Sequence, residues 1–345
     1  MAILLATQKR LWANSGRLCA FPGCEQRLLL PLESNDGEVA VGRECHIVAK
    51  SDGGPRGPSS LDARERERWA PLIEKRDAYA NLILLCGTHH DLVDADVTAY
   101  PVARLVEMKR SHEQAIDELL SSEQRHEDAI EVRYATIVDG WARRIELDDW
   151  RARMSKLVAD AVIREEVLDG FVSVREWLFT RVLPRTLPAL EEAFLNYRLV
   201  SEDLEAVATR YATRRGGLLL VDRVYKEVSG LRAEPDNLRF LEERSEYYQD
   251  LAADLTVELT RAVNLVCDRV REHLWPNYRL DEGYATIGLG LDASLRSTTL
   301  RPLYPTGAPG NPYQGLKRFV SERAQRDWAR GEGLPPDGAR LLDLS

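Results

Sequence analysis

Apolar residues recur at helical spacing over two long stretches in the second half of the chain, residues 190–211 and residues 241–270. Side chains spaced three or four positions apart share one face of a helix, so each stretch predicts a long amphipathic helix. The second predicted helix begins near Pro235 and ends by Trp275, because the following proline disfavours helical conformation in the residue before it. This part of the chain is therefore predicted to be mainly helical.

Shorter patterns predict further elements on both sides of these helices. Alternating apolar residues predict strands at 130–134 and 287–291, and a further helix is predicted at 314–330. In the first third, the pattern predicts helices at 3–14, 61–76, 89–97 and 102–120, a hairpin formed by strands at 39–41 and 45–49, and a strand at 82–85. We therefore expect an α+β fold in which a small mixed domain precedes a larger, mainly α-helical domain with a few strands.

The length and composition support two domains. With 345 residues and 44% hydrophobic residues, the chain can bury two separate cores. The character of the sequence changes near residue 120, so we place one domain at 1–120 and the other at 125–345. No stretch approaches the roughly 18 apolar residues of a membrane span, and the amino terminus does not resemble a secretory leader. A cytoplasmic location without membrane contact is expected.

The charge distribution limits how the protein can contact nucleic acid. The formal net charge is −9, and acidic residues outnumber basic residues from residue 119 onward. A surface that reads nucleic acid broadly carries clustered Lys and Arg, so any contact with DNA is expected to be local. The acidic second domain is expected to bind protein or a small ligand.

Cysteines and histidines are concentrated in the first third. Four of the five cysteines and four of the six histidines precede residue 118. Cys19 and Cys24 flank a turn-forming Pro-Gly, and Cys86 and His89 form a second close pair about sixty residues later. Two such pairs of thiolate and imidazole ligands are typical of a tetrahedral structural zinc site, so these four residues are predicted to bind Zn²⁺.

A second set of residues completes the pattern. A His-Ile pair at His46 is followed by a Gly-rich loop, and Asn81-Leu-Ile-Leu-Leu-Cys leads to His89 and His90, with Asp94 four residues further on. Together with the Ser-Gly-Arg-x-Cys opening, residues 7–118 resemble the HNH (ββα-metal) endonucleases, similar to the nuclease domains of bacterial restriction and antiphage effectors. The resemblance implies a zinc-stapled ββα-metal domain that cuts DNA with a divalent cation such as Mg²⁺, Mn²⁺ or Ni²⁺.

The resemblance also implies residue roles. His46 looks like the general base that deprotonates the attacking water, and His90 looks like a ligand of the catalytic metal. Asn81 is similar to the family residue that braces the loop and orients the histidine strand. Independently of the family, His90 and Asp94 lie four residues apart on a predicted helix, so both can contact one cation, although Asp94 can equally be a surface carboxylate.

Cys45 departs from the family pattern, because many members place an acidic residue or histidine immediately before the base. A thiolate suits soft transition ions better than Mg²⁺. Three interpretations stay open: Cys45 faces the core and Asp94 binds the metal, Cys45 is a ligand of a softer metal, or the domain is a degenerate DNA-binding remnant. In and beside the Gly-rich loop, Arg56 and Lys50 are candidate contacts to DNA phosphates, or simply solvated charges.

The expected function is that of a metal-dependent DNA endonuclease, a bacterial defence effector regulated by its carboxy-terminal domain. That domain is expected to form a homo-oligomer or to bind an operon-encoded protein or a signal ligand, by analogy of layout alone. The alternative is a non-catalytic, zinc-stapled DNA-binding or scaffold protein.

Overall fold

The computed structural model describes residues 3–32, 38–210, 212–221, 235–291, 297–309 and 311–333. The described chain is α+β, mainly helical with small sheets, and forms two compact units. The first unit comprises residues 1–140 and a short later segment, Leu274–Tyr278. The second unit comprises residues 141–273 and 279–345. None of the described helices is both long and apolar enough to cross a membrane.

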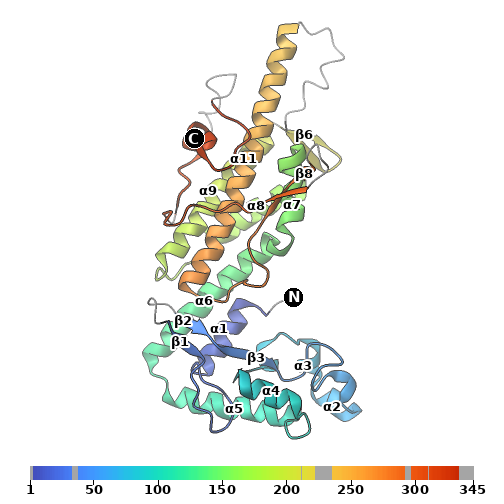
Figure 1. Cartoon of the computed structure of the whole chain (residues 1–345), viewed down its shortest axis with the longest axis vertical. Coiled ribbons are helices and arrows are strands. Elements are labelled where there is room, and N and C mark those ends of the chain that lie inside the picture. Colours follow the sequence, from blue (N-terminus) through green and yellow to red (C-terminus); the bar gives the residue numbers. More distant parts are fainter. Residues whose placement is uncertain are drawn as a thin grey trace. The chain divides into compact units, whose positions relative to one another are not determined.

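The first unit contains short strands and helices, most of which are labelled in Figure 1. Its strands are β1 (Leu29–Pro31), β2 (Glu38–Ala40), β3 (Gly42–His46) and β4 (Leu82–Cys86). Its helices are α1 (Leu5–Asn14), α2 (Ala63–Arg68), α3 (Ala70–Glu74), α4 (Gly87–Ala95), α5 (Val102–Leu119) and most of α6 (Ser122–Arg144), with 3-10 turns η1 (Pro58–Ser60) and η2 (Tyr79–Asn81).

The strand pairing differs from the predicted hairpin. β2 pairs with β1, whereas β3 pairs antiparallel with β4, from Gly42 opposite Cys86 to His46 opposite Leu82. Only one residue separates β2 from β3, which is too short for the chain to reverse between them. β4 is buried along its whole length, so it needs a paired neighbour for its backbone groups, and β3 supplies one.

Two features set the position of β3 and β4. A Cβ atom on Gly42 would lie 2.9 Å from the Trp12 ring and 3.0 Å from Leu28, so only glycine allows β3 to pass this close to α1. In addition, α4 packs against β3 and β4, and it begins directly after β4 ends. The result is a strand–strand–helix unit in which β4 and α4 are continuous in sequence.

The predicted strand at 130–134 is wrong, because these residues lie inside α6. Tyr134 and Val138, one helical turn apart, are both fully buried, so the apolar residues that alternate locally continue at helical spacing. α6 also caps the amino terminus of α1. The residue before α1, Leu4, has no side chain that can accept a hydrogen bond there. Instead, the Asp139 carboxylate of α6 accepts hydrogen bonds from the backbone N–H groups of Leu5 and Ala6.

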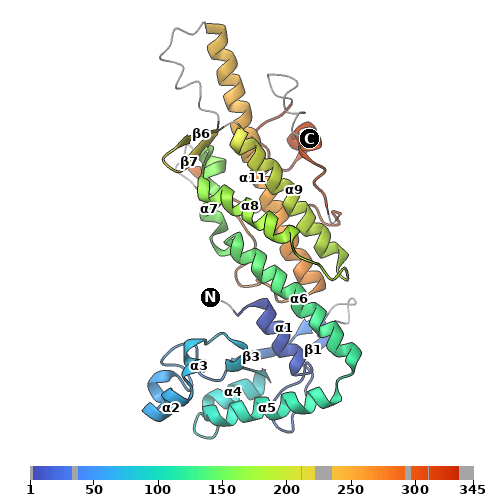
Figure 2. The same cartoon turned by 180° about the vertical axis from the view of Figure 1, so that it is seen from behind.

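The second unit is built around a long helix. Its helices are α7 (Trp150–Asp160), α8 (Glu165–Phe179), α9 (Pro188–Arg210), α11 (Pro235–His273) and α12 (Leu316–Glu322), with 3-10 turns η3 (Leu147–Asp149) and η4 (Arg323–Gln325). Its strands are β5 (Val162–Arg164), β6 (Ala212–Arg215), β7 (Leu218–Val221), β8 (Ile287–Leu291) and β9 (Ser297–Leu300). α9 packs alongside α11 (Figure 2), so the two predicted long amphipathic helices form the core together.

α11 buries charged as well as apolar side chains. Asp254 and Glu258, one turn apart and almost wholly buried, face the segment that follows β9. Asp254 accepts hydrogen bonds from the Arg323 guanidinium at 3.0 Å and from the Arg330 backbone N–H at 2.6 Å. Glu258 accepts from the Tyr304 hydroxyl at 3.0 Å. The segment that follows β9 is therefore attached to α11 by buried polar contacts.

The same contacts explain why the predicted helix at 314–330 is shorter in the structure. α12 ends at Glu322 and η4 at Gln325, and Arg326 has an extended backbone. Arg323 and Arg326 direct their guanidinium groups to Asp254 and Glu258, so the chain turns to satisfy buried carboxylates instead of extending the helix.

We expect Asp254→Ala to lower the free energy of unfolding by about 3–5 kcal/mol, because the substitution leaves the fully buried Arg323 cation without its carboxylate. Urea denaturation of the full chain measures this loss. Glu243→Ala is the matched control, since it removes the exposed pair with Arg239 on the same helix and should cost no more than about 1 kcal/mol. Equal losses in the two variants would contradict the assignment.

Candidate metal centres and active site

Cys19, Cys24, Cys86 and His89 lie together in the first unit, with one potential ligand atom from each within 4.8 Å of the others. The Cys19 and Cys86 sulfur atoms lie 3.6 and 3.2 Å from His89 Nδ1. In a tetrahedral zinc site, bonds of about 2.3 Å to sulfur and 2.0 Å to nitrogen separate these atoms by roughly 3.5 Å. The group can therefore bind a metal ion such as zinc.

Local structure explains how these four residues converge. Cys19 and Cys24 flank a turn in which the Cys24 N–H donates to the Phe21 carbonyl at 3.0 Å and Gly23 takes a positive φ of 76°. Cys86 ends β4, and His89 lies in the first turn of α4. The Phe21 ring stacks on the His89 imidazole, with centroids 3.9 Å apart, and this contact holds the ring in place.

A metal that binds Cys19 has to displace the proton of a buried thiol. Burial raises its pKa to about 12, even though backbone N–H groups, including that of Cys86 at 3.3 Å, oppose the shift. A buried thiol that stays protonated without a metal must lose its proton when a cation binds, so binding releases protons. The backbone N–H that contacts its sulfur is then placed to stabilise the thiolate.

A second group of potential ligands joins β3 to α4. Cys45, His90 and Asp94 each place a ligand atom within 4.8 Å of the others. The Cys45 sulfur lies 3.9 Å from one Asp94 oxygen, and His90 Nε2 lies 3.9 Å from the other. Ligands of a single ion with bonds of about 2.0–2.3 Å lie roughly 3 to 4.5 Å apart, so these separations fit one divalent cation. Of the two ligand groups found among the described residues, this one includes a carboxylate.

Two details bear on the interpretations left open for Cys45. Its side chain is buried, and this burial, together with the Asp94 charge, raises the pKa of the thiol to about 12. Cys45 is therefore buried and also lies close to Asp94. Its burial does not prevent its sulfur atom from serving as a metal ligand together with His90 and Asp94. A metal bound through Cys45 would have to displace its proton, which favours ions with high affinity for sulfur.

The structure corrects the expectation that Arg56 contacts DNA phosphates. Arg56 is only 4% exposed. Its guanidinium donates to the Ile47 and Val93 carbonyl oxygens, at 3.0 and 2.5 Å, and to Asp94 Oδ1 at 2.5 Å. The buried cation offsets the charge of a candidate ligand and ties the Gly-rich loop to β3 and α4. An arginine in a Gly-rich loop is expected to be exposed. The sequence does not show that the loop folds back so that Arg56 reaches acceptors outside it, in Ile47, Val93 and Asp94.

His46, the predicted base, is the last residue of β3 and lies directly after Cys45. Its Nε2 atom lies 3.0 Å from Asp77 Oδ1, and the Lys50 ammonium lies 3.1 Å from Asp77 Oδ2. Burial tends to raise the pKa of Asp77, but the hydrogen bonds and charges of His46 and Lys50 outweigh it and lower the pKa. Lys50 is half exposed, so its contact with DNA stays a prediction.

Asn81 is fully buried at the end of η2, directly before β4, and joins the segments that carry His46 and Asp77. Its side-chain oxygen accepts from the Val48 N–H at 2.8 Å, and its amide donates to the carbonyl oxygens of Val48, at 2.8 Å, and Arg76, at 2.9 Å. The Ile47 N–H donates to the Asn81 carbonyl at 2.8 Å. This geometry is what the bracing role implied by the HNH resemblance requires.

Sequence reasoning missed Asp77 and Tyr79. The Tyr79 hydroxyl accepts from Asn14 and donates to Glu113, both at 2.6 Å, and so anchors the turn that carries Asn81 to α1 and α5. Neither residue belongs to a periodic pattern, and both lie between predicted elements. The one feature of the sequence that could have pointed to Asp77 and Tyr79 is that both lie within four residues of Asn81.

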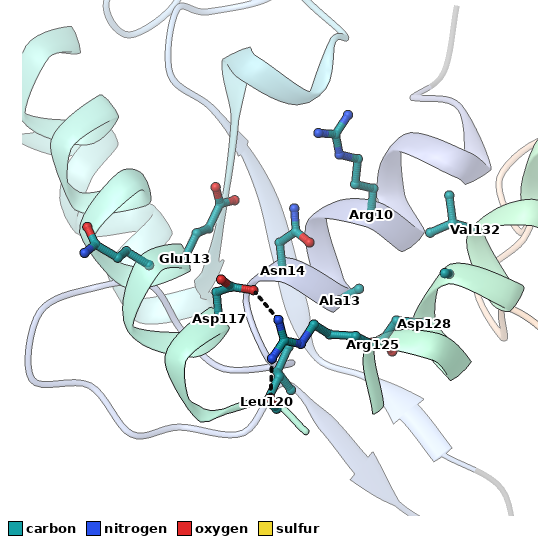
Figure 3. Close-up of a pocket in the computed structure, with 11 residues that line it drawn as sticks. Arg10, Ala13, Asn14, Glu113, Asp117, Leu120, Arg125, Asp128 and Val132 are labelled. Atoms are coloured by element: carbon teal, nitrogen blue, oxygen red, sulfur yellow. Dashed lines mark hydrogen bonds and ion pairs between the residues drawn. The ribbon is translucent and has the colours of Figure 1, made fainter. Parts of the chain in front are cut away.

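The first unit also contains a cavity of about 570 Å³, drawn in Figure 3. Asn14 and Glu113 line it, together with Arg10, Asp117 and Arg125 among others. Arg125 pairs with Asp117 at 3.6 Å, and Glu113 accepts from Lys109 at 2.5 Å, so internal contacts neutralise these acids. None of the residues of the two ligand groups lines this cavity.

Comparison with known proteins does not identify the chain: no protein-family model matches it, and no curated protein matches it. The interpretation of the site therefore depends on its residues and geometry.

We expect the purified protein to contain one zinc ion per chain, bound by Cys19, Cys24, Cys86 and His89, and Cys86→Ser to lose both the zinc and the fold of the first unit. The reason is that the binding free energy of a structural zinc is also folding free energy. Elemental analysis and circular dichroism measure the two losses. Cys267→Ala is the control, because this buried cysteine lies on α11 outside both ligand groups and its loss should leave the zinc content unchanged. A folded wild-type chain without zinc would refute the assignment.

Proposed function

We propose that the protein is a metal-dependent HNH endonuclease that hydrolyses phosphodiester bonds in DNA. The observation that carries the proposal is the juxtaposition of Cys45, His90 and Asp94 across β3 and α4, with His46 directly after Cys45 in the sequence. A phosphodiesterase of this kind needs a cation site and a base in close proximity. His46 is the last residue of β3 and follows Cys45, so the Cα atoms of the proposed base and of one candidate ligand are about 3.8 Å apart.

The proposed division of roles follows from the chemistry of each group. His46 accepts the proton of the attacking water, because a neutral imidazole can serve as a general base near neutral pH. A divalent cation held by Cys45, His90 and Asp94 would stabilise negative charge on the phosphate and the leaving oxygen. Asn81 holds the segment after His46 in place and does not contact substrate. Cys19, Cys24, Cys86 and His89 would hold a structural Zn²⁺ that supports this unit.

The ligand set bears on which cation is used. Mg²⁺ prefers oxygen ligands, whereas this group offers one sulfur, one nitrogen and one carboxylate whose charge Arg56 offsets. Mn²⁺ and especially Ni²⁺ fit such a set better than Mg²⁺. We therefore propose that transition ions support cleavage at lower concentrations than Mg²⁺ does.

Two observations favour a second candidate, a non-catalytic zinc-stapled DNA-binding or scaffold protein. The Asp94 carboxylate already accepts a short hydrogen bond from Arg56, and the Cys45 thiol has a raised pKa. Both groups would have to give up a present partner or proton to bind a cation. Absence of cleavage with every metal, by folded protein that contains zinc, would favour this candidate.

We expect His46→Ala to reduce plasmid cleavage at least about 100-fold, since a general base contributes a factor of this size, with DNA and metal binding retained. His90→Ala should instead raise the metal concentration needed for half-maximal cleavage about tenfold or more. Nicking of supercoiled plasmid with Mg²⁺, Mn²⁺ or Ni²⁺ measures both effects. His126→Ala is the matched control, because this exposed histidine on α6 belongs to neither ligand group. Full activity of His46→Ala would refute the mechanism.

We also propose that the second unit regulates the nuclease by self-association, as in a bacterial defence effector. One HNH site cuts one strand, so a pair of chains is suited to cutting both strands. Exposed apolar side chains support an interface in this unit: Phe179, at the end of α8, is 78% exposed, and Val182 is 72% exposed. Large apolar side chains that stay in contact with water are stabilised when a second surface covers them.

Light scattering on the full chain should then give about twice the monomer mass of 39.1 kDa, and the double substitution Phe179→Ser and Val182→Ser should restore the monomer. Leu119→Ser is the control, since Leu119 is equally exposed, at 81%, but belongs to the first unit. A monomeric wild-type chain at micromolar concentration would argue against this mode of regulation.

A further inference from the structure

Asp77 contacts the proposed base directly, although neither the sequence nor the HNH resemblance assigns it a role. Its two carboxylate oxygens have different partners: Oδ1 lies 3.0 Å from His46 Nε2, and Oδ2 lies 3.1 Å from the Lys50 ammonium. The side chains of His46 and Asp77 are 20% and 28% exposed, so water screens their interaction only in part. The contact therefore has the geometry of a histidine–carboxylate pair.

The surrounding backbone holds this pair in register. Arg76, the residue before Asp77, donates to the Lys50 carbonyl at 2.6 Å and to the Asp52 carboxylate at 2.8 Å. The Arg76 carbonyl accepts from the Asn81 side chain at 2.9 Å. Asn81 in turn bonds both backbone groups of Val48. These bonds come from residues on both sides of Asp77 and attach its segment to the stretch that follows His46.

The chemistry of the two groups determines which ring nitrogen carries the proton. An ionised carboxylate can only accept hydrogen bonds, so the imidazole nitrogen that faces Asp77 must be the donor. In a neutral imidazole only one nitrogen carries hydrogen, which leaves the other with a free lone pair. With Nε2 protonated, Nδ1 of His46 is the basic nitrogen.

We infer that Asp77 is a positioning residue that holds His46 in the tautomer with hydrogen on Nε2, so that Nδ1 accepts the proton of the attacking water. The catalytic part of this inference rests on the proposed nuclease function. Lys50 completes the arrangement, because its ammonium offsets the charge of a carboxylate that would otherwise repel the phosphates of DNA. A histidine that is held in one orientation before substrate binds loses less freedom in the reaction.

Nitrogen-15 NMR of the full-length, zinc-loaded protein tests the tautomer without reference to cleavage. Long-range proton–nitrogen correlations distinguish a protonated Nε2 from a protonated Nδ1, and the His46 signals are assigned by their loss in His46→Gln. We expect hydrogen on Nε2 in the wild type, and a mixture of tautomers in Asp77→Ala. Glu74→Ala, an exposed carboxylate three residues earlier, is the matched control and should leave the His46 signals unchanged.

Cleavage kinetics test the consequence. Asp77→Ala should lower kcat about 10- to 1000-fold with KM and the metal requirement unchanged within twofold, because only the base is affected. Asp77→Glu, which keeps a carboxylate, should recover part of kcat. A wild-type His46 with its ring hydrogen on Nδ1 would overturn the inference, even if the wild type cuts DNA. So would a tautomer distribution of His46 that Asp77→Ala does not change. Failure of the wild type to cleave with any metal, while the tautomer responds as expected, would instead overturn the proposed function.

Discussion

The antiparallel pairing of β3 with β4 is the contact on which both groups of potential metal ligands depend. β4 is buried throughout and runs directly from Cys86 into α4, so its position fixes where α4 begins. His89 and His90 are consecutive residues of that helix, yet His89 belongs to one ligand group and His90 to the other. Neighbouring helical residues point about 100° apart, so one turn of α4 serves two sites. A metal held by His89 would therefore stabilise the orientation of His90 and Asp94.

Polar contacts between distant segments then add precision that apolar packing alone does not supply. Asn81 and Arg76 bond to the stretch that follows β3, Asp77 contacts His46 at the end of that strand, and the buried Arg56 ties the Gly-rich loop to Asp94. Hydrogen bonds depend steeply on direction, so several of them together restrict a side chain to a narrow range of positions. Such restriction suits a site that must hold a base beside a cation.

The second unit uses buried polar groups in another way. Asp254 and Glu258 are buried on α11, and they attach the segment following β9. Desolvation offsets much of the attraction within a buried ion pair, so such pairs contribute less to stability than to the choice of one arrangement over others. The position of this segment on α11 is consequently set by matching charges, whereas the pairing of α9 with α11 follows from apolar surface.

Local spacing in the sequence was sufficient to predict several features: the long helices α9 and α11, the strand at β4, and the ligand pairs Cys19 with Cys24 and Cys86 with His89. Residues a few positions apart on a turn or helix are close whatever the rest of the chain does. The hairpin expected between 39–41 and 45–49 and the strand expected at 130–134 were wrong, because strand pairing and the continuation of a helix depend on partners far away in sequence. For the same reason, only the tertiary structure could bring Cys45 to Asp94, bury Arg56 against that carboxylate, and place Asp77, a loop residue with no periodic signal, beside His46.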